Sequence, residues 1–279
     1  MSETEFEALV SLLDDEDPAV ESHVRQTLLS LGDAAVPRLE FAWEQSSSEV
    51  VQQRLESIIH VIQSQAAIAR LRAWEGSDGQ PLFEGWLGLT QYQFPSIAPE
   101  TYRKEISRLV NRAWLDLRAG MNLVEQIGVI SRLLFASEQY RGNRRSLFDP
   151  QNYFLNGLIE TRRGGPVSLG TLFLIICQEL ELPLHGMVLP GYFVLRNDGG
   201  RHELFVDVFN KGAVFFRSDL QNFLSEVGAD EDDPAFARAA SHVDIVREIA
   251  HQLIVCYHRK KQSGKAAQWE SLLGELGWD

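Results

Sequence analysis

The sequence predicts an α+β fold in which a buried helix packs on an antiparallel sheet, with helical segments on both sides. Apolar residues recur at helical spacing over most of residues 6–134 and again from residue 237. The segment 168–181 is apolar almost all round, which is typical of a helix buried on several sides. Short apolar runs separated by turn residues follow between 186 and 216, as in a meander of strands. Helices beside a meander indicate the α+β class.

The composition is that of an ordinary globular protein. The chain has 279 residues, of which 44% are hydrophobic and 23% charged, enough for one large domain or two modest ones. The net charge of −13 repels phosphate backbones and anionic lipids, so we expect neither nucleic acid nor a membrane as a partner.

Targeting signals and membrane spans are not visible in the sequence. The first residues are acidic rather than basic and apolar, and the longest apolar stretch is far shorter than the ~20 residues of a membrane span. We therefore expect a cytoplasmic protein. Its two cysteines, Cys177 and Cys256, lie in apolar helical contexts and are expected to be buried thiols rather than a disulfide.

Residues 1–75 are expected to form a helical region. Asp17 is placed to cap a helix that begins at Pro18, and Gly32 is placed to end it. The segment from Leu12 to Leu39 carries an acidic turn, an Asp-Pro start and a Gly-x-x-Ala-Val-Pro junction. In these features it resembles a HEAT-like helical repeat.

The middle of the chain begins after a Gly- and Pro-containing segment, 76–81, which is the best candidate for a linker. We expect helices over 82–92, 102–117 and 123–134. Asn152 is expected to cap a helix that runs to about Arg162, and the buried helix follows from Ser168 to Glu181. The expected strands are 186–189, 192–195, 203–208 and 213–216.

Five motifs between Leu133 and Gly212 identify the family that this segment resembles, because their order and spacing match over about 80 residues. The motifs are Asp149-Pro150-Gln151-Asn152, Arg163 to Leu169, Leu182-Pro183-Leu184, Leu189-Pro190-Gly191 with Phe193, and Asp207-Val208-Phe209-Asn210. They resemble the SirB-type branch of the transglutaminase-like superfamily. The resemblance implies a papain/transglutaminase-like core over residues 81–220. The helices of 237–279 resemble a degenerate tetratricopeptide pair.

The resemblance also implies where a catalytic site would lie. The family's nucleophile at the start of the central helix corresponds to Ser168, its histidine base to Tyr192, and its orienting aspartate to Asp207. A serine hydroxyl needs a base to remove its proton, and a tyrosine with a pKa near 10 is a poor base at neutral pH. The expected constellation is therefore degenerate.

Other residues offer alternatives for the missing groups. His202 precedes Asp207 by an odd number of residues, which places the two on opposite faces of a regular strand. His185 precedes the strands and is a second candidate base. Cys177 lies about 2.5 turns into the helix, too deep to act as a displaced nucleophile. No spacing typical of a metal site is present, and we expect no metal or cofactor.

A positive cluster stands out in this acidic chain. It has two interpretations: a solvated loop with a helix end, or a docking patch for an acidic segment of a partner protein. Arg162 and Arg163 also complement the dipole of the preceding helix. The cluster consists of Arg141, Arg144, Arg145, Arg162 and Arg163.

Two functions from different classes follow. The first is a catalytically degenerate transglutaminase-like protein that binds or regulates a protein or peptide. The second is a weak hydrolase or acyltransferase that uses Ser168 with a base from elsewhere in the chain. The first is favoured because Tyr192 occupies the position of the base.

Overall fold

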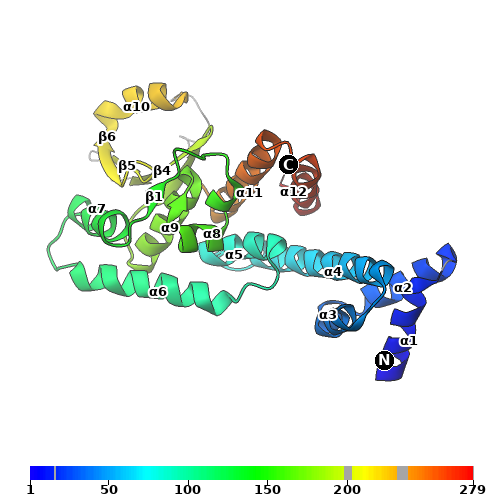
Figure 1. The fold of residues 1–279 in the computed structure, drawn as a ribbon. Helices are drawn as coiled ribbons and strands as arrows, with labels where there is room; N and C mark the ends of the chain where they lie inside the picture. Colours follow the sequence, from blue (N-terminus) through cyan, green and yellow to red (C-terminus); the bar gives the residue numbers. More distant parts are fainter. Residues whose placement is uncertain (16, 198–202, 231–237, 279) are drawn as a thin grey trace. The chain divides into compact units, whose positions relative to one another are not determined.

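The computed structural model describes residues 1–15, 17–197, 203–230 and 238–278 (Figure 1). The chain divides into two compact units, Met1–Arg72 and Ala73–Asp279. The helix α4 (Glu49–Glu75) begins in the first unit and ends in the second. Each unit is described by itself.

The first unit is helical, as predicted. It contains α1 (Glu3–Ser11), α2 (Pro18–Ser30), α3 (Val36–Gln45) and most of α4, with short 3-10 turns at Leu12–Asp14 and Asp33–Ala35. The carboxylate of Asp17 accepts a hydrogen bond from the amide of Ala19 at 2.9 Å, so the predicted cap is confirmed. Gly32 follows α2 with a φ of +66°, a left-handed conformation that favours glycine. Apolar side chains from all four helices share one core, which includes Phe6, Leu28, Leu39, Leu55 and Ile58.

The second unit opens with three long helices. These are α5 (Leu82–Gln93), α6 (Pro99–Asp116) and α7 (Leu123–Ser131), and α7 continues into a π-helical turn at Arg132–Ser137. Residues 76–81, which we expected to be a linker, lie inside this unit. There the indole of Trp74 donates a hydrogen bond to the carbonyl of Pro81 at 2.8 Å.

The expected cap at Asn152 is wrong. Asp149 caps a 3-10 turn at Pro150–Asn152, and α8 (Leu155–Thr161) begins only afterwards, following Phe154. Asn152 is buried and directs its side chain at the loop before it. Two short strands, β1 (Arg141–Gly142) and β2 (Arg163–Gly164), pair in parallel and so join the segment before the 3-10 turn to the segment after α8.

The helix α9 (Pro166–Glu179) and an antiparallel meander form the centre of the unit. Among the described residues, the sheet has the order β3 (His185–Leu189), β4 (Tyr192–Asn197), β5 (Leu204–Asp207) and β6 (Ala213–Phe216). All residues of α9 from Pro166 to Cys177 are buried, and the helix packs on β3 and β4. A Cβ at Gly170 would lie 2.1 Å from the ring of Phe193, so this contact requires glycine. The predicted α+β class is confirmed.

The last helices complete the unit. After α10 (Leu220–Val227), α11 (His242–Arg259) packs on α5, α9 and β3, and α12 (Ser263–Leu276) packs on α11. In Figure 1, α11 lies beside α9, and α12 follows it at the C-terminus. No helix within the described parts of the chain has both the length and the apolar character to cross a membrane.

Candidate functional site

Ser168, the matched nucleophile position, lies in the first turn of α9 and is completely buried. Its hydroxyl donates a hydrogen bond to the carbonyl of Asn152. It also accepts one from the amide of Gly165 at 2.9 Å, as a capping residue does. A serine hydroxyl has a single proton to donate, and here a backbone carbonyl receives it. The hydroxyl therefore fixes the start of the helix.

The two glycines before α9 are required by close packing. A Cβ at Gly164 would lie 2.9 Å from the hydroxyl oxygen of Ser168 and 2.7 Å from a methyl group of Leu158. A Cβ at Gly165 would lie 2.5 Å from the ring of Tyr153. The backbone before α9 is therefore so closely packed that a side chain at either glycine would displace its neighbours.

Tyr192 and Asp207, the other two matched positions, lie next to each other. The hydroxyl of Tyr192 donates to the carboxylate of Asp207 at 3.0 Å, and the amide of Asn210 donates to the same oxygen at 3.1 Å. Burial raises the pKa of Tyr192, and the negative charge of Asp207 raises it further. The phenol is therefore a neutral donor whose proton is directed at Asp207, and it is not a base for Ser168.

Aromatic rings and one arginine surround this pair. Tyr192 meets Phe209 and Phe223 edge to face, with ring centroids 6.0 and 5.7 Å apart. The guanidinium of Arg144 lies 4.9 Å from the centroid of Phe209. Burial raises the pKa of Asp207, whereas the hydroxyl of Tyr192 and the positive charge of Arg144 act in the opposite direction.

Helix α11 closes the other side of Tyr192. Glu248 and Gln252 lie against Pro166 and Tyr192, and the space between these side chains is too small for a water molecule. Glu248 accepts a hydrogen bond from the amide of Gln252 at 2.8 Å, and burial raises the pKa of its carboxyl group. A substrate therefore has no open path to the start of α9 between these residues.

The histidines do not supply the missing base in the described structure. The hydrogen bonds described for Ser168 run to backbone atoms of Asn152 and Gly165, and none runs to a histidine. His185 pairs with Arg196, at the opposite end of the β3–β4 hairpin from the pair formed by Leu189 and Tyr192. Four residues along a strand correspond to about 13 Å. His202 lies outside the described residues.

The two cysteines are not activated. Cys177 and Cys256 are both buried and form no disulfide. Burial raises the pKa of both thiols, that of Cys256 to about 12. Neither is a thiolate at neutral pH. Among the residues that the structure describes, no three His, Cys, Asp or Glu side chains gather as they would around a metal ion.

The five arginines of the sequence cluster fall into two groups. Arg141, Arg144 and Arg145 are exposed, and Arg163 pairs with Arg141 in the register of β1 and β2. Arg162 takes a left-handed conformation after α8, with a φ of 58°. Its side chain turns inward, over the ring of Tyr140 at 4.6 Å, and joins an ion-pair network.

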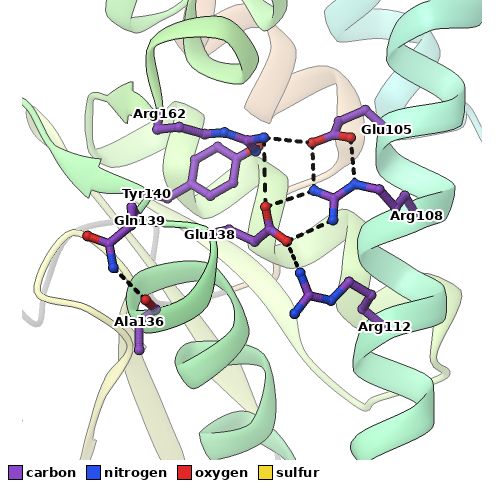
Figure 2. A network of polar contacts seen from close by, with 8 residues as sticks. All are labelled: Glu105, Arg108, Arg112, Ala136, Glu138, Gln139, Tyr140 and Arg162. Carbon is purple, nitrogen blue, oxygen red and sulfur yellow. Dashed lines mark hydrogen bonds and ion pairs between the residues drawn. The ribbon is translucent and has the colours of Figure 1, made fainter.

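Figure 2 shows this ion-pair network, which the sequence analysis did not predict. Glu138 accepts hydrogen bonds from both terminal nitrogens of Arg108 at 2.8 Å and contacts Arg112. Glu105 accepts from Arg108 at 2.8 Å and from Arg162 at 3.0 Å. The only sign of the network in the sequence is the spacing of residues 105, 108 and 112, which lie on one face of a helix. The network ties α6 to the end of the π-helical turn and to the end of α8.

The network also changes the acidity of its carboxyl groups. Hydrogen bonds from Arg108 lower the pKa of Glu105 and of Glu138, against the opposing effect of burial. Both carboxylates are mostly shielded from solvent, with side chains 19% and 9% exposed, whereas the arginines remain more open. The network thus joins α6, the π-helical turn and α8, and within it Arg162 pairs with carboxylates of this chain.

Comparisons with known proteins find several with similar sequences. The chain is 31% identical over 151 residues to a UPF0162 protein of Vibrio cholerae, covering 54% of this chain and 56% of that protein. It is 26% identical over 193 residues to a UPF0162 protein of Xylella fastidiosa, covering 67% of this chain and 69% of that protein. It is also 23% identical over 180 residues to the human F-box only protein 21, covering 56% of this chain and 28% of that protein.

No solved structure matches the chain significantly. The family model described as the transglutaminase-like superfamily matches residues 100–251. The matched region extends from the start of α6 into α11, and it includes Ser168, Tyr192 and Asp207. Because the match spans more than half of the sequence, the chain belongs to the transglutaminase-like superfamily.

Proposed function

We propose that this chain is a catalytically inactive member of the SirB-type branch, which binds a protein or peptide and thereby regulates it. The observation that carries the proposal is the hydrogen bonding of Ser168. Its hydroxyl donates to the carbonyl of Asn152 inside the protein, while the hydroxyl of Tyr192 donates to Asp207. The base and orienting positions are thus linked to each other, and neither is hydrogen-bonded to the nucleophile position.

The rates expected for such an arrangement are low. An enzyme of this type moves the proton of the nucleophile to a base with a pKa near 7. Loss of one member of a catalytic triad lowers the rate by several powers of ten. Here the base position is a phenol whose pKa is raised, and the nucleophile is completely buried. Both features support a binding function.

The helical flanks support a protein partner. We infer that the first unit is a HEAT-like element and that α11 and α12 form a tetratricopeptide-like pair. Helical repeats of these kinds present extended surfaces that bind other proteins. The acidic net charge supports a cytoplasmic protein without affinity for nucleic acid or anionic membranes.

The proposal is tested by reacting the purified full chain with a fluorophosphonate probe, which labels activated serines. We expect no labelling of Ser168 and no release of product from amide and ester substrates. The variant Ser168→Ala gives the background of both assays, and circular dichroism shows that the proteins are folded. Labelling that is present in the wild type and absent from Ser168→Ala would establish the alternative, a weak hydrolase or acyltransferase.

A further inference from the structure

The loop from Arg141 to Asp149, here called the basic loop, presents positive charge at the surface, although Arg144 also lies over the ring of Phe209. Arg141, Arg144 and Arg145 are exposed. Within the described parts of the chain, no carboxylate lies within ion-pair distance of these three side chains. By contrast, the exposed Arg70, Arg112, Arg217 and Arg238 each lie within ion-pair distance of a carboxylate.

The position of Arg163 increases this charge. The register of β1 and β2 places Arg163 beside Arg141, and backbone hydrogen bonds fix this register. Like charges directly opposite each other on neighbouring strands destabilise a sheet. Arg163 likewise has no carboxylate partner among the described residues. An anionic group bound between the two guanidinium groups would remove this repulsion.

The basic loop is held in place from several sides. Its inner side rests on Asn152, whose side-chain amide donates to the carbonyls of Ser146 at 2.7 Å and Leu147 at 3.0 Å. The same side chain accepts a hydrogen bond from Asn143 at 2.9 Å. At the end of the loop, Asp149 pairs with Lys260 at 3.2 Å. A loop that is already ordered loses little conformational entropy on binding.

The end of α11 adds a cation beside an exposed aromatic ring of the loop. The guanidinium of Arg259 lies 5.1 Å from the ring centroid of Phe148, which is 41% exposed. Arg259 is exposed, as is Lys261 two residues further along the chain. Residues far apart in the sequence thus combine arginine and an open aromatic ring, two groups that contribute strongly to protein interfaces.

We propose that the basic loop and the end of α11 together bind an acidic segment of a partner protein. Carboxylates of that segment pair with Arg141, Arg144 and Arg145, and an apolar side chain of it packs on Phe148. A short acidic peptide meets the local positive charge, whereas a long nucleic acid also meets the repulsion of the acidic chain as a whole. This assignment rests on the proposed binding function and identifies its partner class.

The test uses the full chain and a fluorescein-labelled synthetic peptide, Glu-Asp-Glu-Phe-Glu-Asp-Glu, in an anisotropy titration. We expect saturable binding that weakens as salt is raised. The double variant Arg144→Glu/Arg145→Glu is expected to weaken binding at least about tenfold. Phe148→Ser in the protein, or replacement of the peptide's Phe by Ser, is expected to weaken it about threefold or more.

The matched control is Lys104→Glu/Arg118→Glu, one residue on α6 and one just after it, which changes the net charge equally at two exposed residues. We expect it to change binding less than about twofold. Equal weakening by both double variants, absence of peptide binding, or equally tight binding of a single-stranded oligothymidylate would each overturn the assignment. Labelling of Ser168 alongside normal peptide binding would instead overturn only the proposed lack of catalysis.

Discussion

The hydroxyl of Ser168 donates to the backbone carbonyl of Asn152, whose side chain in turn holds the basic loop. The residue at the position of a nucleophile thereby supports a surface that presents arginines. This relationship connects the start of α9 with the loop between β1 and the 3-10 turn that precedes α8. In this one contact the hydroxyl donates its proton to a backbone carbonyl and supports the loop.

Removing that hydroxyl is expected to destabilise the protein. Ser168→Ala removes this donor from the buried carbonyl of Asn152, and it removes the nearer of the two acceptors of the Gly165 amide, which keeps its 3.3 Å bond to the same carbonyl. The expected loss in the free energy of unfolding is about 1–3 kcal/mol, measured by urea denaturation. The control is Ser107→Ala at an exposed position on α6, which should change stability by less than about 0.5 kcal/mol. A neutral Ser168→Ala would mean that the hydrogen bond contributes nothing.

Tyr192→Phe is expected to change how stability depends on pH. The pKa of Asp207 is raised in the folded protein, so this group favours folding most below its unfolded pKa of about 3.9. That contribution is lost as pH rises through the folded pKa. The hydroxyl of Tyr192 opposes the rise in pKa, so its removal should deepen the loss of stability between about pH 4 and pH 7. Parallel curves for wild type and variant would contradict this role.

The network of Figure 2 predicts a loss of stability in acid. The pKa values of Glu105 and Glu138 are lowered in the folded protein. Their contribution is therefore present above the unfolded pKa of about 4.3 and lost as pH falls toward the lower folded values. Glu138→Gln should cost about 1–3 kcal/mol at pH 7, less than for a fully buried pair because its arginines are partly exposed.

The control for that variant is Glu179→Gln, an exposed residue at the end of α9. It should leave the free energy of unfolding at pH 7 within about 0.5 kcal/mol of the wild-type value. The difference between the two variants should shrink as pH falls below about 4 and toward the lower folded pKa of Glu138, where the carboxylate becomes protonated in the folded state as well. A difference that stays constant with pH would show that packing rather than charge is lost.

Two glycine-to-alanine substitutions are expected to change the stability of the protein in opposite directions, one through a close contact and the other through helix propensity. Gly170→Ala places a Cβ about 2.1 Å from the ring of Phe193 and should cost about 1–3 kcal/mol. Gly264→Ala, in the first turn of α12, meets open space and should stabilise the protein by up to about 1 kcal/mol. Thermal denaturation of the two variants measures both effects, and equal shifts in Tm would contradict the close contact.

The secondary structure was largely predictable because it depends on local patterns. The cap at Asp17, the buried helix and the strands of the meander follow from residue spacing and turn chemistry. The cap at Asn152 was wrong because its side chain makes three hydrogen bonds to the basic loop instead of one to a helix amide. The local sequence does not indicate that the loop, rather than a helix, provides the hydrogen-bond partners of this side chain.

The site was predictable in its positions but not in its connections. A motif locates Ser168, Tyr192 and Asp207, and the geometry shows that only the last two are joined. Arg162 belongs to the sequence cluster of arginines, yet its left-handed backbone directs it to Glu105. Lys260 pairs with Asp149 and Glu248 lies against Pro166 and Tyr192, residues far from them in the sequence, and periodicity carries no information at such separations.

The packing of α11 on α5 has a consequence for synthesis of the chain. Tyr257 donates to Gln93 at 3.2 Å, and seven apolar or aromatic side chains of α11 are buried. During translation, α5 emerges long before its partner, so its apolar side stays exposed to water until residue 259 has left the ribosome. A chain truncated before His242 would keep the residues of its central helix and sheet, but the apolar side of α5 would stay exposed to water. Such a chain should aggregate rather than fold as a smaller domain.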